Sequence, residues 1–215
     1  MTNLIDQFFV AYLEAFNSIT VFTNTTPKEM MASPVNKEGW FKWKTVTGTL
    51  QDADYKNIED HFNIELPKSF IDWHKAYFFL GGDCSILRLP TSNPNEPLQE
   101  IKRNLNWHVP QQLIPQKLYP FASEGNDTGP LVFDARSPLV NNEFPIRIYN
   151  QEFGGDIEGL GEIIFSSFRK LLECLTHYLT QLKTRKSFEI IPDFFQIDPA
   201  GAGKQGRNYW LGFVG

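Results

Sequence analysis

Apolar residues near the start of the chain recur every three or four positions, the spacing that places them on one side of an α-helix. The residues concerned are Leu4, Ile5, Phe8, Phe9, Tyr12, Leu13 and Phe16. Thr2 or Asn3 can cap the start of this helix. We therefore predict an amphipathic first helix that docks on the core.

Two further helices are predicted on either side of Pro67. The first spans residues 52–63 and has an aspartate available as its N-cap. The second starts at Pro67, because proline suits the first helical position, and it runs to residue 78. The glycine pair at 81–82 can supply the positive-φ residues that end it.

Short apolar runs separated by Gly, Asn, Asp and Pro fill the middle of the chain, a pattern typical of strands joined by turns. The predicted strands are residues 84–89, 113–121, 131–134, 145–149 and 163–165, with a short helix at 98–105 between the first two. The later connections are short enough for an antiparallel meander.

Ser166 or Ser167 caps the clearest helix of the chain, whose apolar stripe runs from Phe168 to Leu182. Basic residues follow in its last turn, where they suit the helix C-terminus. Beyond it, residues 188–197 and 208–214 read as two strands. Helices first, strands next and a helix after them favour an α+β fold over a βαβ alternation.

Composition indicates a globular chain with an aromatic core. The sequence has 215 residues, among them 19 Phe, 7 Tyr and 5 Trp. Two cysteines are too few for a disulfide framework, so we expect a reducing compartment, the cytoplasm. No apolar run reaches the roughly 18 residues that span a bilayer, so we expect no membrane partner.

Negative charge is concentrated in one part of the chain. The net charge is −5, and residues 124–162 hold eight acidic residues against two arginines. Binding to nucleic acid depends mainly on Lys and Arg that neutralise phosphates. We therefore expect no direct nucleic-acid partner.

Motifs for catalysis and ligand binding are weak. Gly201, Gly203 and Gly206 satisfy GxGxxG, but only nine residues follow, too few for the helix and strand of a dinucleotide site, so we interpret the segment as a turn. The four histidines show no metal-ligand spacing, and Cys84 and Cys174 lie far apart in sequence. We predict no catalytic residue, metal or cofactor. A hydrolase built on paired carboxylates stays open as an alternative.

Three stretches of the chain carry a further signal. They are residues 58–70 with the glycines at 81–82, residues 118–122 with 125–127 and 133–134, and residues 145–149 with 166–172. In order and spacing they resemble the SUKH superfamily, the Smi/Knr-type domains of bacterial immunity proteins and fungal cell-wall regulators. Asn126 and Thr128 depart from the family's glycine run.

The resemblance implies a curved antiparallel sheet flanked by helices, with no known catalytic centre. In bacterial members it implies an antidote to a polymorphic toxin, often a nuclease. It covers residues 40–182; residues 1–39 are then an N-terminal helix and linker packed on the core, and residues 183–215 a C-terminal β extension of the same domain.

We therefore expect a protein-binding domain, a monomer or weak homodimer, that meets a cognate toxin or other protein through acidic loops. Exposed aromatics would anchor the partner inside a polar rim. The predicted contact residues are Phe121, Glu124, Asp127, Asp134, Tyr149, Glu152, Phe153, Asp156 and Glu158. Two alternatives stay open: a regulatory or scaffold module, and loops that are acidic only because they are solvated.

Overall fold

The computed structural model describes residues 2–16 and 18–214. Its strands are β1 (Ile19–Val21), β2 (Trp40–Lys42), β3 (Val46–Thr47), β4 (Tyr77–Phe78), β5 (Leu87–Arg88), β6 (Leu118–Glu124), β7 (Pro130–Asp134), β8 (Ile146–Tyr149) and β9 (Leu160–Phe165). Its α-helices are α1 (Thr2–Ala15), α2 (Asp52–Phe62), α3 (Lys68–Ala76), α4 (Gln99–Leu105), α5 (His108–Leu113), α6 (Phe168–Gln181), α7 (Ser187–Ile190), α8 (Phe194–Ile197) and α9 (Arg207–Leu211). Shorter helical turns are η1 (Lys28–Met30), η2 (Ile114–Gln116), η3 (Gln151–Phe153), η4 (Ile157–Gly159), η5 (Ile191–Asp193) and the π-helical η6 (Gly201–Gln205).

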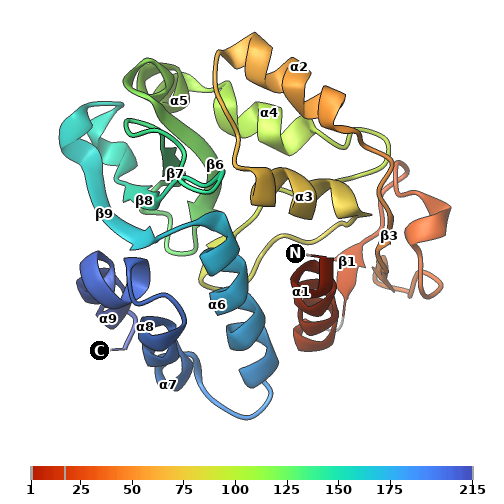
Figure 1. Ribbon diagram of the computed structural model, residues 1–215. Coiled ribbons are helices and arrows are strands. Elements are labelled where there is room, and N and C mark those ends of the chain that lie inside the picture. The colour runs from red at the N-terminus through yellow and green to blue at the C-terminus, as the bar shows by residue number, and fades with distance from the viewer. Residues whose placement is uncertain (1, 17, 215) are drawn as a thin grey trace.

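The centre of the fold is a five-stranded sheet in the order β5-β6-β7-β8-β9, with every neighbouring pair antiparallel (Figure 1). The predicted meander and the α+β class are confirmed. The register shifts once within the β6–β7 pair and twice within the β8–β9 pair. Such irregularities bend a strand and increase its twist.

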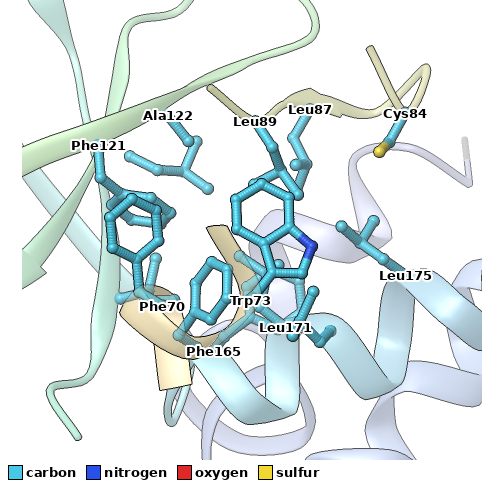
Figure 2. Close-up of a cluster of buried hydrophobic side chains, with 14 of the residues drawn as sticks. Phe70, Trp73, Cys84, Leu87, Leu89, Phe121, Ala122, Phe165, Leu171 and Leu175 are labelled. Carbon is cyan, nitrogen blue, oxygen red and sulfur yellow. The ribbon is translucent and has the colours of Figure 1, made fainter. Parts of the chain in front are cut away.

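Helices α3 and α6 cover one face of this sheet (Figure 2), and aromatic rings of both helices meet Phe121 of β6 edge-on. The ring of Phe70 lies 5.7 Å from that of Phe121 and 5.2 Å from that of Phe168. Phe121 stacks on Phe133 with 3.9 Å between ring centroids. Each of these rings is almost completely buried, so the aromatic residues form the core that the composition predicted.

Helix α5 covers part of the opposite face with a second, smaller apolar cluster. Its buried members are Val109, Leu113, Leu118, Val132 and Tyr149. Because both faces are covered, β6 and β7 are buried almost throughout instead of alternating between buried and exposed positions.

The N-terminal helix is confirmed: α1 packs against α6, and Phe9 stacks on Trp73 of α3 with 6.2 Å between ring centroids. Thr2 and Asn3 both lie inside the helix, so neither is its cap. Met1, which precedes this helix in sequence, lies outside the described residues.

The helix predicted at 52–63 is also confirmed, but its N-cap is Gln51 and not the predicted aspartate, because Asp52 and Asp54 lie inside α2. The Asp54 carboxylate accepts from the backbone N–H of Gln51, the residue before α2, and Asn63 ends the helix in the left-handed region at φ 53°. Helix α3 ends at Ala76, earlier than predicted, because Tyr77 is extended and begins β4, which pairs with β3. The glycines at 81–82 therefore do not end it.

Several strand boundaries differ from those predicted. The strand expected over 84–89 is reduced to Leu87–Arg88, and residue 113 ends α5, so that β6 starts only at Leu118. The last strand is longer than expected and begins at Leu160. The predicted short helix at 98–105 corresponds to α4.

The C-terminal segment is helical, so the two strands predicted there are wrong. Apolar residues of short helical turns, among them Ile190, Phe194 and Trp210, are fully buried against the rest of the core. The indole N–H of Trp210 donates to the carbonyl of Ile164 in β9 at 3.0 Å. In a short apolar run bounded by Gly and Pro, periodicity alone does not distinguish a strand from a helix.

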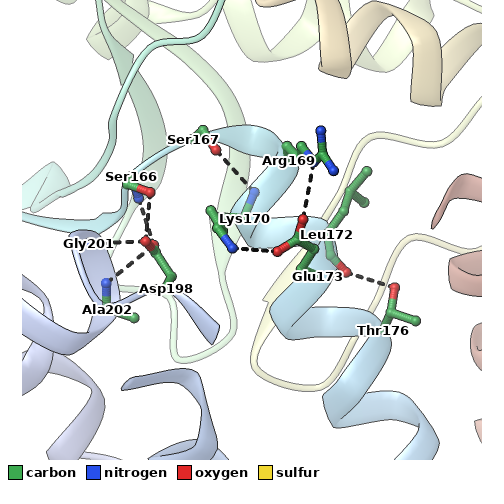
Figure 3. Close-up of polar contacts among 10 residues, drawn as sticks. All are labelled: Ser166, Ser167, Arg169, Lys170, Leu172, Glu173, Thr176, Asp198, Gly201 and Ala202. Carbon is green, nitrogen blue, oxygen red and sulfur yellow. Dashed lines mark hydrogen bonds and ion pairs between the residues drawn. The ribbon is translucent and has the colours of Figure 1, made fainter. Parts of the chain in front are cut away.

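Asp198 fixes this segment to the junction between β9 and α6 (Figure 3). Its carboxylate accepts from the backbone N–H and hydroxyl of Ser166 at 2.7 and 2.6 Å, and from the N–H groups of Gly201 and Ala202 at 3.1 and 3.3 Å. A Cβ on Gly201 would lie 2.2 Å from the nitrogen of Ser166, so only glycine fits there. The GxGxxG segment thus forms the π-helical η6 and not the predicted turn. We call its contact with Asp198 the clasp.

Candidate functional site

Two loops of the acidic region meet at one end of the sheet, the β6–β7 turn (residues 124–129) and the β8–β9 connection (residues 150–159). The backbone N–H of Gln151 donates to the carbonyl of Thr128 at 3.1 Å, and its side-chain amide donates to the carbonyl of Asp127 at 2.8 Å. In a meander, alternate connections lie at the same end of the sheet, which is why residues far apart in sequence become neighbours.

The connection at residues 150–159, which we call the acidic lobe, has a defined conformation. The Asn150 side chain accepts from the N–H of Glu152 at 3.0 Å, and the Asp156 side chain accepts from the N–H of Glu158 at 3.1 Å, so each caps a short helical turn. The three acidic residues are exposed, and the lobe contains no Lys or Arg.

Two apolar side chains stand among these carboxylates. Phe153 is 45% exposed and Ile157 is 44% exposed. Phe153 follows Glu152, and Ile157 lies between Asp156 and Glu158. The lobe therefore presents apolar groups within an acidic surround, the composition of a small protein-contact patch.

Tyr149 supports the lobe through hydrogen bonds and is not an exposed anchor residue. It is fully buried at the end of β8. Its hydroxyl donates to the carbonyl of Asp156 at 2.8 Å and accepts from the N–H of Gly155 at 2.8 Å. Gln116 also donates to the carbonyl of Gly155 at 2.8 Å, which ties the lobe to η2.

Phe121 and Glu124 are also buried, which corrects their prediction as contact residues. Phe121 belongs to the central core. The Glu124 carboxylate accepts from the N–H of Asn126 at 2.6 Å and from that of Thr128 at 3.4 Å, so it shapes the β6–β7 turn. An acidic residue in a turn can accept hydrogen bonds from nearby backbone N–H groups, and it is then not available to a binding partner.

Asp134 lies inside an ion-pair cluster and is likewise no surface group. Arg136 donates to it twice at 2.7 Å, and Arg147 donates through Nε at 2.7 Å. Burial opposes the charge of this carboxylate, but the hydrogen bonds from both guanidinium groups outweigh burial and hold its pKa below the usual value. Both arginines of residues 124–162 are thus paired at the sheet, away from the lobe.

Four of the nine predicted contact residues remain on the exposed lobe, and Asp127 joins them from the neighbouring turn with a side chain that is 83% exposed. Sequence reasoning missed Ile157, although its position between two acids was a usable signal. It also missed Trp107, which is 39% exposed. Trp107 lies 20 residues before Asp127 in sequence, and nothing local indicates that the fold brings it near this surface.

Trp107 and Asp127 line a small hollow beside the lobe, with a volume of about 100 Å³. The full lining is Asn104, Trp107, Pro120, Ala122, Ser123, Asp127, Gly129, Pro130 and Gln151. Gln151 thus belongs both to the lobe and to the hollow. Together the hollow and the lobe form the acidic face of the protein.

A second exposed apolar surface lies on the outer strand β1. Ile19 and Val21 pair with Lys42 and Trp40 of β2, and their side chains together with that of Trp40 are exposed. Paired residues in a sheet point to the same face. This surface carries no acidic residue in its paired positions, so its chemistry differs from that of the acidic face.

Glu143 is the carboxylate that bears on the hydrolase alternative. Burial raises its pKa, and it lines a hollow of about 640 Å³ together with Asp72. Its carboxylate accepts from the N–H of Phe168 at 3.1 Å, at the first turn of α6. Asp72 pairs with Lys68 at 2.6 Å. Both acids therefore have structural partners, and neither is arranged as a free acid–base pair.

His74 has a structural environment as well. It is fully buried, and burial lowers its pKa to about 4. Its Nε2 faces the carbonyl of Thr91 at 3.3 Å and therefore carries the proton, so the hydroxyl of Tyr55 donates to Nδ1 at 2.7 Å. Among residues 2–16 and 18–214, no three His, Cys, Asp or Glu residues group as metal ligands.

Comparison with known proteins gave no relative: no family model, no curated protein and no solved structure matches this chain. The similarity of residues 40–182 to the SUKH superfamily stays a prediction. Within the part of the chain that the structure describes, no helix has the length and apolar character needed to cross a membrane.

Proposed function

We propose that this protein is a partner-binding domain whose acidic face docks on a basic surface of another protein, and that the partner is a cognate toxin. The observation that carries the proposal is the pair of exposed apolar side chains, Phe153 and Ile157, set among the exposed carboxylates of a fixed lobe.

The energetics of protein interfaces support this use. A few apolar anchors surrounded by a polar rim provide most of the binding energy at an interface. Exposed carboxylates around Phe153 and Ile157 add complementarity to a cationic surface and raise the rate of association before contact. A net charge of −5 strengthens that attraction.

The lobe is also prepared for binding. Tyr149, Gln116 and the side-chain caps at Asn150 and Asp156 hold its backbone through hydrogen bonds. A surface that is ordered before it binds loses less conformational freedom on association. Binding through the acidic face therefore costs less conformational entropy, so that a small contact area can still give affinity.

A nuclease toxin fits the chemistry of the acidic face, because an active site that holds phosphates is electropositive. An acidic, anchored lobe can occupy such a site and exclude the nucleic acid. The similarity of residues 58–70, 118–134 and 145–172 to immunity domains favours the same class of partner, in the cytoplasm of the producing cell.

The test is co-purification with the product of the adjacent upstream gene, followed by growth rescue from that product. The variant E152Q/E158Q should lower affinity and flatten its dependence on salt, because it removes two charges and leaves the Asp156 cap intact. Glu29 and Glu38, exposed acids far from the lobe in sequence, give the matched control E29Q/E38Q. Equal affinity and salt dependence for both variants would contradict the proposal.

A regulatory or scaffold module that takes an extended peptide is the second candidate. It is favoured by the outer edge of β1, which pairs with no further strand among the described residues and where apolar side chains flank a backbone that can add another strand. The variant V21T/W40S should then weaken partner binding while E152Q/E158Q leaves it unchanged. The opposite result supports the acidic face.

A further inference from the structure

We infer that the hollow beside Trp107 is a receptor for one arginine side chain of the partner. The inference rests on the proposed function for the source of that arginine, since the hollow adjoins the lobe at Gln151. Its chemistry follows from the size of the hollow, its aromatic wall and the kind of hydrogen-bonding groups around it.

The volume of the hollow fits a single side chain better than a whole small molecule. Its volume is about 100 Å³. Sites for metabolites and cofactors are usually about 300–1,000 Å³. The hollow therefore suits one planar head group delivered from a larger molecule.

The apolar wall suits a flat cation. Trp107, the residue before α5, contributes an indole that is 39% exposed. Pro120 and Pro130 of β6 and β7 line the same hollow. A guanidinium group stacks on tryptophan through both cation–π attraction and planar contact, which makes arginine a better fit here than lysine.

Two side-chain amides of the lining, those of Asn104 and Gln151, each keep an oxygen that can accept a hydrogen bond. The Asn104 side-chain amide donates to the carbonyl of Phe121 at 2.8 Å, and that of Gln151 donates to the carbonyl of Asp127 at 2.8 Å. Because the amide nitrogen is the donor in each case, the orientation of the amide is fixed and its oxygen is left to accept a hydrogen bond. Among the described residues, neither of these two oxygens accepts a hydrogen bond that meets ordinary geometry.

A carboxylate completes the set. Asp127 is held in the left-handed region at φ 60° by the turn that Glu124 caps. Its side chain is 83% exposed and its contact with Arg88 is a long, exposed one at 3.9 Å. Exposed ion pairs of this kind contribute little, so Asp127 can exchange Arg88 for an arginine of the partner.

No lysine or arginine lines the hollow among the residues that the structure describes; Arg88 and Arg103 line the neighbouring hollow, which shares Asn104 and Ser123 with it. Asn104 and Gln151 thus offer acceptors with no cation in the lining, and Asp127 has only the long contact with Arg88. A guanidinium group has five N–H donors and no acceptor, which is the complement of this lining. The same reasoning disfavours an anionic head group.

The experiment uses nuclear magnetic resonance of the full chain with three probes: N-acetyl-arginine amide, the lysine analogue, and N-acetyl-citrulline amide, which is neutral and nearly isosteric with the first. The reporters are the indole signal of Trp107 and the side-chain amide signals of Asn104 and Gln151. We expect saturable shifts with arginine amide, and binding about tenfold weaker with citrulline amide, because the charge is lost. Equal binding of arginine and citrulline amides would overturn the inference.

Variants locate the binding. W107F and D127N should each weaken arginine-amide binding about threefold, since each removes part of one interaction at an exposed site. W40F changes the exposed tryptophan on β2 and is the matched control. Unchanged binding in both W107F and D127N, or an equal loss in W40F, would contradict the assignment.

The same variants separate this inference from the proposed function. If E152Q/E158Q weakens the complex with the toxin while W107F and D127N do not, the arginine receptor is wrong and the docking proposal stands. If E152Q/E158Q has no effect, the docking proposal fails, while saturable and charge-dependent binding of arginine amide still supports the receptor.

Discussion

The hydroxyl of Tyr149 and the carbonyl of Asp156 meet at 2.8 Å, and this contact joins the buried end of β8 to the exposed tip of the acidic lobe. The same hydroxyl accepts from the N–H of Gly155. One buried side chain therefore satisfies two backbone groups of a loop that carries the proposed contact residues. The core and the candidate site are linked at this point.

Removing this hydroxyl should loosen the lobe. We expect Y149F to lower the free energy of unfolding by about 1–3 kcal/mol, because the carbonyl of Asp156 and the N–H of Gly155 lose their partner. Hydrogen exchange should accelerate over residues 150–159. Urea unfolding and exchange mass spectrometry measure the two effects.

The matched control is Y178F. Tyr178 is also fully buried, and its hydroxyl pairs with Ser187 at 2.7 Å, outside the acidic face. Y178F should destabilise the protein to a similar degree without changing exchange in the lobe. Equal acceleration of the lobe in both variants would contradict the role given to Tyr149.

The two exposed apolar residues of the lobe should matter for binding and not for folding. We expect F153A and I157A to weaken the complex with the toxin by about 2 kcal/mol each, as anchors do, with little change in the free energy of unfolding. Calorimetric titration and urea unfolding measure these quantities. V140A, at a site that is 70% exposed in another loop, is the control and should change neither.

His74 should make stability depend on pH. Its pKa falls from 6.5 to about 4 on folding, so between these values the unfolded chain binds a proton that the folded chain does not. The contribution is fully present above pH 6.5 and is lost as the pH falls towards 4, a loss of about 3 kcal/mol at 1.4 kcal/mol per pKa unit. Urea unfolding across this range measures it.

Two variants isolate that effect. H74Q, which cannot titrate, should be less stable at pH 7 because it disturbs the contacts with Tyr55 and Thr91, yet its stability should fall less between pH 6.5 and 4. H61Q replaces a histidine that is exposed on α2 and should keep the slope of the parent. An unchanged slope in H74Q would show that another group titrates.

The clasp at Asp198 should hold the C-terminal helices on the sheet. We expect D198A to lower the free energy of unfolding by about 3 kcal/mol or more, since Ser166, Gly201 and Ala202 lose a buried acceptor. Thermal unfolding and the fluorescence of buried Trp210 report on it. D193N, which alters a partly exposed ion pair with Arg185, should cost under about 1 kcal/mol.

Prediction from sequence was most successful where one element carried its own signal. The stripe from Phe168 to Leu179 and the Ser167 cap, whose hydroxyl accepts from the N–H of Lys170 at 3.1 Å, located α6 to within a residue. The predicted exposure of Glu152, Phe153, Asp156 and Glu158 also holds.

It was least successful where burial depends on distant partners. Tyr149 and Phe153 are both aromatic residues near the acidic connection, yet one is fully buried and the other is 45% exposed. The difference arises because α5 covers the sheet above Tyr149, and α5 is 36 residues or more away in sequence. Similarly, Glu124 became a turn cap and Asp134 became an ion-pair centre once their neighbours were in place.

The amino-acid sequence by itself determined the class of fold, the long helices, the antiparallel meander and the concentration of acid between 124 and 162, because periodicity, caps, turn residues and charge are local properties. Tertiary structure alone decided that the C-terminal segment is helical, which acids are exposed, and that Trp107 stands beside Asp127. These outcomes depend on contacts between residues remote in sequence, where burial and hydrogen bonding to distant groups outweigh local preference.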